Sequence, residues 1–459
     1  MSEAPMKENR MGTAPILPLL LKISLPMVIS MMVQALYNVV DSLFVARLSE
    51  NALTAVSMAF PIQNLMIAVA VGTGIGVSSL LSKRLGEKNH QAVTGVAGNS
   101  ILLALFSYLL FLLFGLFFTK VFFDLQTSSE VIRRYGYDYL RIVTVFSFGI
   151  FGQICFERLL QATGKTLFVL LSHGIGAVIN IIMDPILIFG WGPIPALGVS
   201  GAAIATVLGQ VAGWLFAMVI NRLYNTELRL RFRRIRLDLR IVGEIYKVGF
   251  PSIIMQSIGS VMTLGMNHVL ESFNRITATL GDTAVATFGV YFKLQSFVFM
   301  PVFGFNNGLV PIVAYNYGAR RKDRLLRAVK WAMLFDCGYM LLGTVAMLGI
   351  PHVMLRWFDA SPTMLSLGVP ALRIIGCSFV IAAFCIVCSN VFQALGNGVY
   401  SMIVSIARQL VVLLPCAFLL ATTRNVNAVW WAFPIAEVSS LLVTLFFFRR
   451  ILKNKVSTI

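Results

Sequence analysis

The chain has 459 residues, of which 58% are hydrophobic and 12% are charged, and its formal net charge is +18. A mean hydropathy of +0.83 excludes a soluble domain, because too few charged side chains remain to cover a surface that faces water. Nucleic-acid binding is excluded as well, since the basic residues are divided among short loops and form no separate basic domain. The composition therefore indicates an integral membrane protein.

Apolar segments of membrane-spanning length follow one another along the whole chain. A helix needs about 20 residues to cross the hydrocarbon layer. Twelve segments meet this length, near residues 16–46, 51–82, 91–119, 134–160, 165–190, 196–222, 241–270, 283–317, 325–348, 367–394, 399–421 and 427–450. We therefore expect an all-α integral membrane protein with twelve transmembrane helices.

The second half of the chain repeats the first half in the same direction. Lys-Ile-Ser-Leu-Pro at 22–26 resembles Lys-Val-Gly-Phe-Pro at 247–251, and Gln-Ala-Thr-Gly at 161–164 matches Gln-Ala-Leu-Gly at 393–396. Two repeats of six spans each enter the membrane from the same side, so a pseudo-twofold axis is expected along the membrane normal. The expected parts are an N-lobe of spans 1–6 at 1–225, a basic cytosolic linker at 226–240, and a C-lobe of spans 7–12 at 241–459.

The charges of the loops predict the orientation. With both termini in the cytosol, 23 basic residues of the loops and ends face the cytosol and 7 face the opposite side. This bias favours a multi-pass protein of the cell (inner) membrane with both termini cytosolic. The first apolar stretch is too long for a secretory signal, so we expect it to remain as the first span. We interpret the basic run at 229–240 as a contact with anionic lipid heads.

Ionisable side chains inside the spans are the candidates for function, because an acid at mid-helix costs about 2.5 to 3.5 kcal/mol on insertion scales. Five acids meet this condition: Asp41, Glu157, Asp184, Asp336 and Glu437. We expect Asp336 to pair with a basic loop residue, and the sequence assigns no role to Glu437.

Asp41 and Asp184 are the strongest of these candidates. Asp41 shares a helical face with Tyr37 and Asn38, and Asp184 follows Asn180 by one turn. If the two carboxylates face each other, their repulsion favours one shared proton near neutral pH, which would make a proton switch. The same oxygens also suit a sodium ion, and a third interpretation is that the pair only joins helices through hydrogen bonds.

Other motifs predict no catalytic, metal or cofactor site. All six cysteines lie in apolar spans, where they are expected to pack, and Cys385 and Cys388 have no second pair nearby. Gly164-Lys165-Thr166 lacks the glycine that a nucleotide-binding loop requires five positions earlier. We therefore expect no cofactor and no bound ATP.

Amides, aromatic rings and methionines are expected to line a substrate cavity. Such walls suit hydrophobic or cationic compounds through stacking and cation–π attraction, although ordinary helix packing is the alternative. The expected substrate contacts are Gln34, Asn38, Gln63, Gln153, Gln256, Tyr291, Gln295 and Met300.

Several motifs in order along the chain resemble those of the multidrug and toxic compound extrusion (MATE) family. These are the runs at 34–44, 180–185 and 198–206 and the repeated Gln-Ala-x-Gly turn, and the DinF-like branch is the most similar. The resemblance implies a V-shaped pair of six-helix bundles that exports drugs in exchange for protons or sodium ions.

The resemblance also implies a cation site in the N-lobe, formed by Tyr37, Asp41, Tyr139, Asn180, Asp184 and Thr206. A position that is usually an amide is Glu157 here, and a salt bridge with the adjacent Arg158 is its alternative role. The other main branch has an acid on span 7, where this chain has only Gln256 and Asn267. N-lobe coupling is therefore expected, with protonation bending span 1 at a hinge near Pro26.

We thus expect a monomeric, non-enzymatic antiporter that exports hydrophobic or cationic compounds. Two alternatives stay open. A flippase for a lipid-linked substrate needs several bases in its cavity, for which Lys293, Arg373 and Arg408 are the candidates. A membrane-embedded enzyme needs clustered His, Ser or metal ligands, and the chain has neither HExxH nor GxSxG.

Overall fold

The computed structural model describes residues 8–228, 235–275, 280–358 and 360–459. In these residues every regular element is a helix, apart from one isolated β-bridge between Trp191 and Ile194. Ten helices are long and apolar enough to span a membrane, and two bent helix pairs bring the number of spans in the described chain to twelve. The predicted fold class and the predicted number of spans are confirmed.

The first half contains α1 (Arg10–Thr13), α2 (Ile16–Leu48), α3 (Glu50–Gly86), α4 (His90–Phe117), α5 (Thr119–Gln126), α6 (Glu130–Val145), α7 (Phe148–Ala162), α8 (Thr166–Phe189) and α9 (Val199–Leu223). Side-chain caps fix several of their starts. The Ser49 hydroxyl accepts from the Ala52 amide at the start of α3, and the Asn89 side chain accepts from the Ala92 amide at the start of α4.

The second half contains α10 (Leu239–Glu271), η2 (Ser272–Arg275), α11 (Leu280–Gly318), α12 (Lys322–Gly349), α13 (Pro351–Arg356), α14 (Pro362–Gly376), α15 (Phe379–Ala394), α16 (Gly398–Ile406), η3 (Ala407–Leu413), α17 (Leu414–Ala421), α18 (Val426–Val429), α19 (Ala432–Ile451) and η4 (Leu452–Val456). Part of the predicted basic linker at 226–240, including four of its arginines, lies outside the described residues.

Several spans are less regular than the sequence predicts. The fourth span is bent by 43° between α6 and α7, and the tenth by 49° between α14 and α15. In the eleventh span the segment η3 is a π-helix that ends two residues before Pro415. A proline has no N–H and its ring collides with the carbonyl group one turn earlier, so the wider π turn accommodates it without ending the span.

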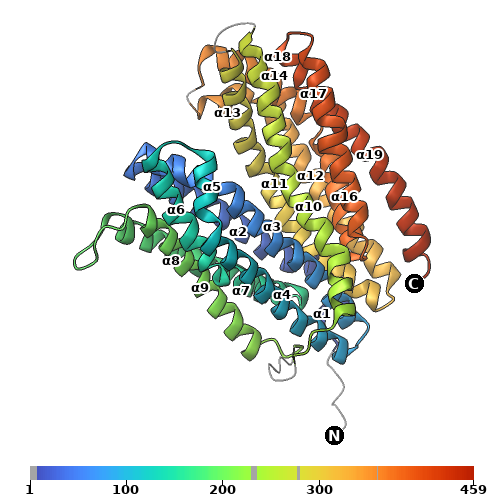
Figure 1. Ribbon diagram of the computed structural model, residues 1–459. Coiled ribbons are helices and arrows are strands. Elements are labelled where there is room, and N and C mark those ends of the chain that lie inside the picture. The colour runs from blue at the N-terminus through green and yellow to red at the C-terminus, as the bar shows by residue number, and fades with distance from the viewer. Residues whose placement is uncertain (1–7, 229–234, 276–279, 359) are drawn as a thin grey trace.

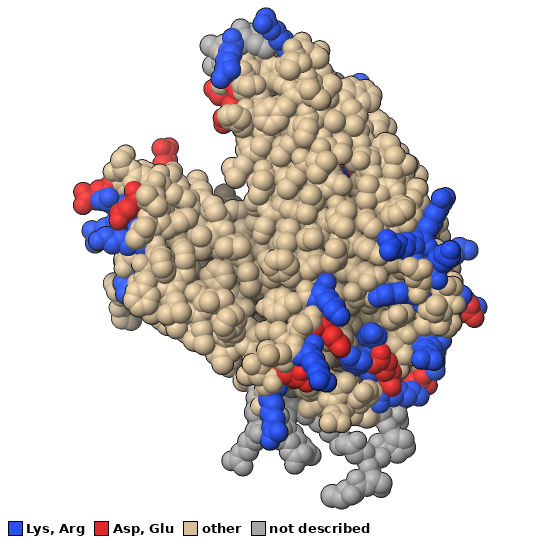
Figure 2. Space-filling view, turned by 45° about the vertical axis from the view of Figure 1, so that its right-hand side comes forward, with Lys and Arg blue, Asp and Glu red and all other residues tan. Residues whose placement is uncertain are grey.

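The helices form two bundles that diverge toward one end of the molecule and meet at the other, as Figure 1 shows for α2–α9 and α10–α19. Figure 2 shows a hollow between the two arms and a broad belt almost free of charged side chains, with lysines and arginines gathered at the ends. An apolar belt between charged ends is the surface that a bilayer requires.

The closed end of the V is built on close backbone packing between the halves. A Cβ atom on Gly86 of α3 would collide with the carbonyl oxygen of Tyr315 on α11. A Cβ atom on Gly318 of α11 would collide with the carbonyl oxygen of Lys83 on α3. Gly86 and Gly318 are equivalent in the two repeats, so the same contact is made twice around the pseudo-twofold axis.

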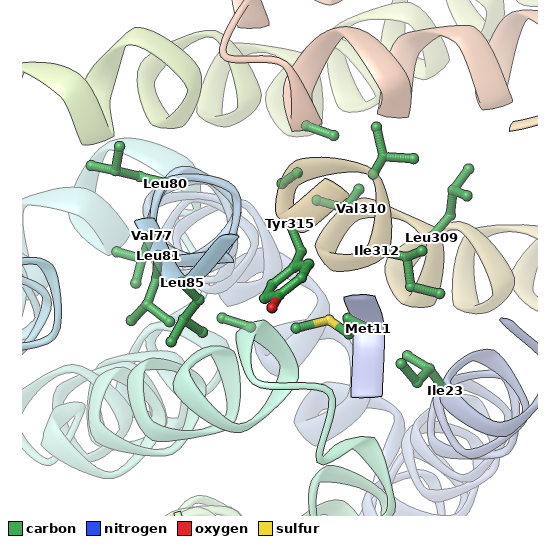
Figure 3. Close-up of a cluster of buried hydrophobic side chains, with 14 of the residues drawn as sticks. Met11, Ile23, Val77, Leu80, Leu81, Leu85, Leu309, Val310, Ile312 and Tyr315 are labelled. Carbon is green, nitrogen blue, oxygen red and sulfur yellow. The ribbon is translucent and has the colours of Figure 1, made fainter. Parts of the chain in front are cut away.

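Apolar side chains from α1, α2, α3 and α11 seal this end, and Figure 3 shows the ring of Tyr315 pointing toward the sulfur of Met11. Met11 is 1% exposed and Leu309 is 0% exposed, so these side chains are shielded from water. The backbone of α1 is held from both bundles. The Asn9 amide donates to the Thr163 carbonyl group at 3.2 Å, and the Asn316 amide donates to the Met11 carbonyl group at 3.1 Å.

Candidate functional site

A cavity of about 620 Å³ lies between the two bundles. Its wall includes side chains of α2, α3, α6, α7, α8 and α9 from the first half and of α10, α11, α15, α16, η3 and α19 from the second. A cavity of this size fits a drug-sized molecule. Because both halves supply the wall, a change in the angle between the bundles changes the shape of the cavity.

Asp41 and Asp184 meet at the N-lobe side of this cavity. Asp41 lines the wall from α2, Asp184 is 0% exposed on α8, and the two carboxyl groups lie within electrostatic reach of each other. Tyr37 and Tyr139 lie within the same reach of both acids. The structure therefore brings together four of the six residues that the family resemblance indicated, and they come from α2, α6 and α8.

Asn180 and Thr206 complete the predicted set from α8 and α9. The Asn180 amide donates to Asp184 Oδ1 at 3.5 Å, while the Thr206 hydroxyl donates to the Ala202 carbonyl group at 3.0 Å and lines the cavity. In the described chain, three buried oxygens of this group have no hydrogen-bond donor: Asp41 Oδ1, Asn180 Oδ1 and Asp184 Oδ2. Buried acceptors without a donor are costly, and a proton or a sodium ion would satisfy them.

Glu157 belongs to a second polar cluster. Its Oε1 accepts from the Gln153 amide at 3.0 Å and from the Ser172 hydroxyl at 2.6 Å, and its Oε2 lies 3.3 Å from His173 Nε2. The other ring nitrogen of His173 is 2.6 Å from the Ser30 hydroxyl of α2. His173 thus joins α8 to both α2 and α7, which makes it an interface residue.

The sequence does contain a signal for this cluster. Ser172, Gly176, Asn180 and Asp184 recur every four residues, which places them along one face of α8. Glu157 forms no direct ion pair with its neighbour Arg158 in the described chain, because adjacent residues on a helix do not face each other, although the two charges interact from a distance.

Five of the eight predicted substrate contacts line the cavity, namely Gln34, Asn38, Gln63, Gln153 and Gln256. Gln63 also donates to the Tyr139 hydroxyl at 3.0 Å. Tyr291, Gln295 and Met300 are not among the described residues of this wall. Tyr291 is 2% exposed and stacks on Phe288 with 6.1 Å between ring centroids, so it belongs to the C-lobe core.

Two arginines line the cavity, Arg158 of α7 and Arg408 of η3. Arg408 was one of the expected interior bases, whereas Arg158 was expected only as a salt-bridge partner of Glu157. The other two expected bases lie elsewhere. Lys293 is exposed beside the ring of Phe358 at 5.9 Å, and Arg373 is exposed on α14.

Two further acids have partners that the sequence did not indicate. Asp336 Oδ2 accepts from the Asn306 amide of α11 at 2.6 Å, and Asp336 is 1% exposed, so the expected pairing with a basic loop residue is wrong. Glu437 of α19 forms an ion pair with Arg408 at 3.1 Å. Both contacts join helices that are about 30 residues apart in the chain.

A bundle of two related halves around a shared polar cavity is the architecture of a secondary membrane transporter. The MatE family matches residues 26–186 and 252–419, and the chain belongs to this family. It is therefore a multi-pass membrane protein.

Relatives of known name cover nearly the whole chain. One is the multidrug export protein MepA of Staphylococcus haemolyticus (strain JCSC1435), 26% identical over 92% of this chain and 91% of that protein. Another is an FAD transporter of Shewanella oneidensis, also 26% identical, over 93% of each chain. A solved structure described as the outward-facing conformation of a multidrug resistance MATE family transporter of the MOP superfamily has a TM-score of 0.90, with 25% identity and 100% of both chains covered.

Proposed function

We propose that the chain is a secondary active exporter that moves drug-like hydrophobic or cationic compounds out of the cytosol. The observation that carries this proposal is the pair of carboxyl groups, Asp41 and Asp184, beside a cavity that both bundles share. A relative with 26% identity is a multidrug export protein, which supports the same function. No catalytic step is part of the proposal.

The driving ion is proposed to act at the oxygens that lack donors, Asp41 Oδ1, Asn180 Oδ1 and Asp184 Oδ2. A proton that enters from the outside removes one of the two negative charges, and with it the repulsion between the carboxyl groups of α2 and α8. Each proton that crosses the membrane supplies about 2.3 kcal/mol per 100 mV. Sodium is the second candidate, since Tyr37 and Thr206 add the hydroxyl oxygens that a hard cation prefers.

The transport cycle is proposed to follow from the shape of the molecule. The V opens away from α1, and the positive-inside bias places α1 in the cytosol, so the cavity faces the outside. Ion binding then changes the course of α2, which contains Pro26 within one continuous helix, and substrate is released. We propose the cell inner membrane as the location and a monomer as the working unit.

A flippase for a lipid-linked pyrophosphate is the second candidate, and the cavity supports it less well. Such a substrate needs several bases without an acidic partner. In the described wall the guanidinium groups are those of Arg158 and Arg408, and Glu437 already neutralises the latter.

The proposal is tested with the purified chain in vesicles whose proton and sodium gradients are set independently. We expect ethidium accumulation driven by an imposed proton gradient, or by a sodium gradient if sodium is the coupling ion. Accumulation under neither gradient contradicts the proposed function.

A further inference from the structure

The end of the cavity nearest the closed tip of the V contains a guanidinium group with neutral partners. Arg158 Nη1 donates to Gln161 Oε1 at 2.8 Å and to Asn307 Oδ1 at 3.4 Å. In the described chain no carboxylate oxygen lies within 4.0 Å of a guanidinium nitrogen of Arg158, so Arg158 forms no ion pair. A positive charge away from bulk water without an anion beside it is costly.

The side chain of Arg158 has a defined course. A Cβ atom on Gly74 of α3 would lie 2.6 Å from Arg158 Cγ, so only glycine leaves room for the arginine stem at this point. The stem crosses α3 and the guanidinium group reaches the wall of the cavity. Glu157, the preceding residue, bonds to His173 and Ser172 and forms no ion pair with Arg158, so its charge acts on the guanidinium group only from a distance.

Two amide groups on the same wall also lack a strong acceptor. Among the described residues, Asn307 Nδ2 donates to Met31 Sδ and Gln393 Nε2 donates to Met255 Sδ, each at 3.7 Å. A thioether sulfur is a weak acceptor. Arg158, Asn307 and Gln393 therefore present hydrogen-bond donors to the cavity from α7, α11 and α15.

The donors and the acids occupy opposite ends of the cavity. Arg158 lies one turn from the end of α7 at the closed tip, whereas Asp184 lies 18 residues along α8 from that same tip. At a rise of about 1.5 Å per residue, the two positions differ by roughly 20 Å along the membrane normal. One end of an elongated molecule can therefore contact Arg158 at the closed end, while the acidic pair at the other end stays free for the driving ion.

We propose that Arg158, with Asn307 and Gln393, forms an anion-binding subsite at the closed end of the cavity, and that the exporter accepts aromatic compounds that carry a carboxylate, sulfonate or phosphate group. This inference rests on the proposed function, because it assigns a substrate class to the same cavity. The planar guanidinium group binds such oxyanions with two parallel hydrogen bonds, and the aromatic part of the compound contacts walls such as Phe60 and Phe303.

The test uses two probes that differ in one group. Rhodamine 110 carries a free carboxylate, and rhodamine 123 is its methyl ester, so the pair isolates the anionic group. Transport is measured in vesicles with the purified full chain under the gradient that drives ethidium. We expect transport of both probes by the wild-type chain. Arg158→Gln should raise the KM for rhodamine 110 about tenfold or more and leave the KM for rhodamine 123 within about twofold.

Three further variants separate binding from a structural role. Arg158→Lys keeps the positive charge but cannot form the two parallel hydrogen bonds of a guanidinium group. We therefore expect an intermediate KM for rhodamine 110. Asn307→Leu serves as a second probe of the subsite should Arg158→Gln fail to fold. Arg373→Gln is the matched control, because Arg373 is exposed on α14 and is not part of the described wall.

The outcomes distinguish failure of the anion subsite from failure of the proposed export function. Transport of rhodamine 123 without rhodamine 110 overturns the anion subsite and leaves the proposed function intact. An equal loss of both probes in Arg158→Gln shows that Arg158 only joins the lobes, and this also overturns the subsite. Transport of ethidium without either rhodamine overturns the substrate class and leaves the proposed function intact. If ethidium is not transported either, the proposed function fails, and fluorescence anisotropy of rhodamine 110 with the detergent-purified chain still tests the subsite. Rhodamine 110 binding that is unchanged in Arg158→Gln contradicts it.

A final arm distinguishes a free organic anion from a lipid headgroup. A fluorescent phosphatidylglycerol is placed in the same vesicles, and its movement between leaflets is followed by dithionite quenching. Movement of this lipid without transport of rhodamine 110 would contradict the substrate class proposed here.

Discussion

Asp41 and Asp184 illustrate how a residue in a span obtains a function from its neighbours. Asp184 is 0% exposed, and Asn180, which donates to it, is 2% exposed, so its carboxyl group is shielded from water on α8. Asp41 lies on the cavity wall and connects this shielded group to the space that substrate would occupy. A change in the charge of Asp41 therefore alters its electrostatic interaction both with a substrate in the cavity and with Asp184 on α8.

Replacing Asp41 by asparagine should abolish ion-driven efflux while leaving expression and folding unchanged. The amide has the same size but cannot bind or release the proton, and the loss of one coupled proton removes about 2.3 kcal/mol at 100 mV, or about fifty-fold in accumulation. Ethidium efflux from cells that express the variant measures the effect. Asp124→Asn, which only breaks a surface ion pair with Arg133 at 3.4 Å, is the control, and drug resistance equal to wild type in Asp41→Asn would remove Asp41 from the mechanism.

Glu227 predicts a dependence of stability on pH at the closed end. Burial raises the pKa of this carboxyl group, while the nearby charge of Lys165 and the hydrogen bond from Asn9 lower it. The folded chain therefore holds this proton more tightly than the unfolded chain, and the associated stability is present at low pH and lost as the pH rises through the raised pKa.

The corresponding variant is Glu227→Gln, which resembles the protonated form at every pH. We expect its Tm to exceed that of the wild-type chain by an amount that increases from pH 4 to pH 8. Thermal unfolding of the two purified chains measures this difference, with the exposed Glu50→Gln as a control. A difference that stays constant or shrinks with pH contradicts the assignment.

Some residues of the candidate site could be predicted from the sequence and others could not. Asp41 and Asp184 were predicted because a carboxylate in an apolar span has a high cost that marks it. Tyr291 was assigned to the cavity although it packs in the C-lobe core, because an aromatic residue on a helix looks the same in either place. Arg158 was missed because its neighbour Glu157 offered a simple partner, and only the rotation of 100° per helical residue argues against that pair.

At the scale of elements, the spans were predictable and their irregularities were not. Hydropathy over about 20 residues locates a span whatever it packs against, so all twelve were found. The bend between α6 and α7 and the partner of Asp336 depend on contacts between distant segments, for which a single sequence gives no signal. The π-helix η3 is the exception, since Pro415 follows its last residue by two positions.

The contact between α3 and α11 predicts a strong effect of small substitutions. Gly318→Val places a side chain against the backbone of Lys83, and overpacking of this kind costs about 1 to 3 kcal/mol or more. We expect a lower Tm and a wider separation between spin labels placed on α3 and α11 at the closed end. Gly338→Val on α12 is the control, because a Cβ atom there has no neighbour within 4 Å, and equal effects of the two variants would argue against the seam.

At the scale of the whole molecule, the repeat explains why both chain ends lie at one face. Asn9 donates to the Gln-Ala-Thr-Gly turn at Thr163, and Lys455 donates to the equivalent Gln-Ala-Leu-Gly turn at Leu395. Because these turns are related by the repeat, the N- and C-terminal segments occupy the same side of the membrane. The excess of basic residues in the loops on this side predicts that it faces the cytosol.

Single cysteines in a chain whose six native cysteines are replaced test this orientation. We expect Ser457→Cys to react with a membrane-impermeant maleimide only after cells are permeabilised, because the C-terminus is proposed to be cytosolic. Ser129→Cys, which precedes α6 at the opposite end, should react in intact cells. The reverse pattern would invert the proposed topology and place the cavity opening in the cytosol.

The attachment of α1 has a consequence for biogenesis and for engineering. The first helix is fixed by Arg321, Arg324 and Asn316, which are synthesised some 300 residues later. The helix α1 can therefore dock only after the eighth span, α11, has been inserted. Until then the closed end of the newly made chain lacks the contacts that α1 provides. A protein tag fused to the front of the chain would interfere with this late step, whereas one fused to the back would leave it undisturbed.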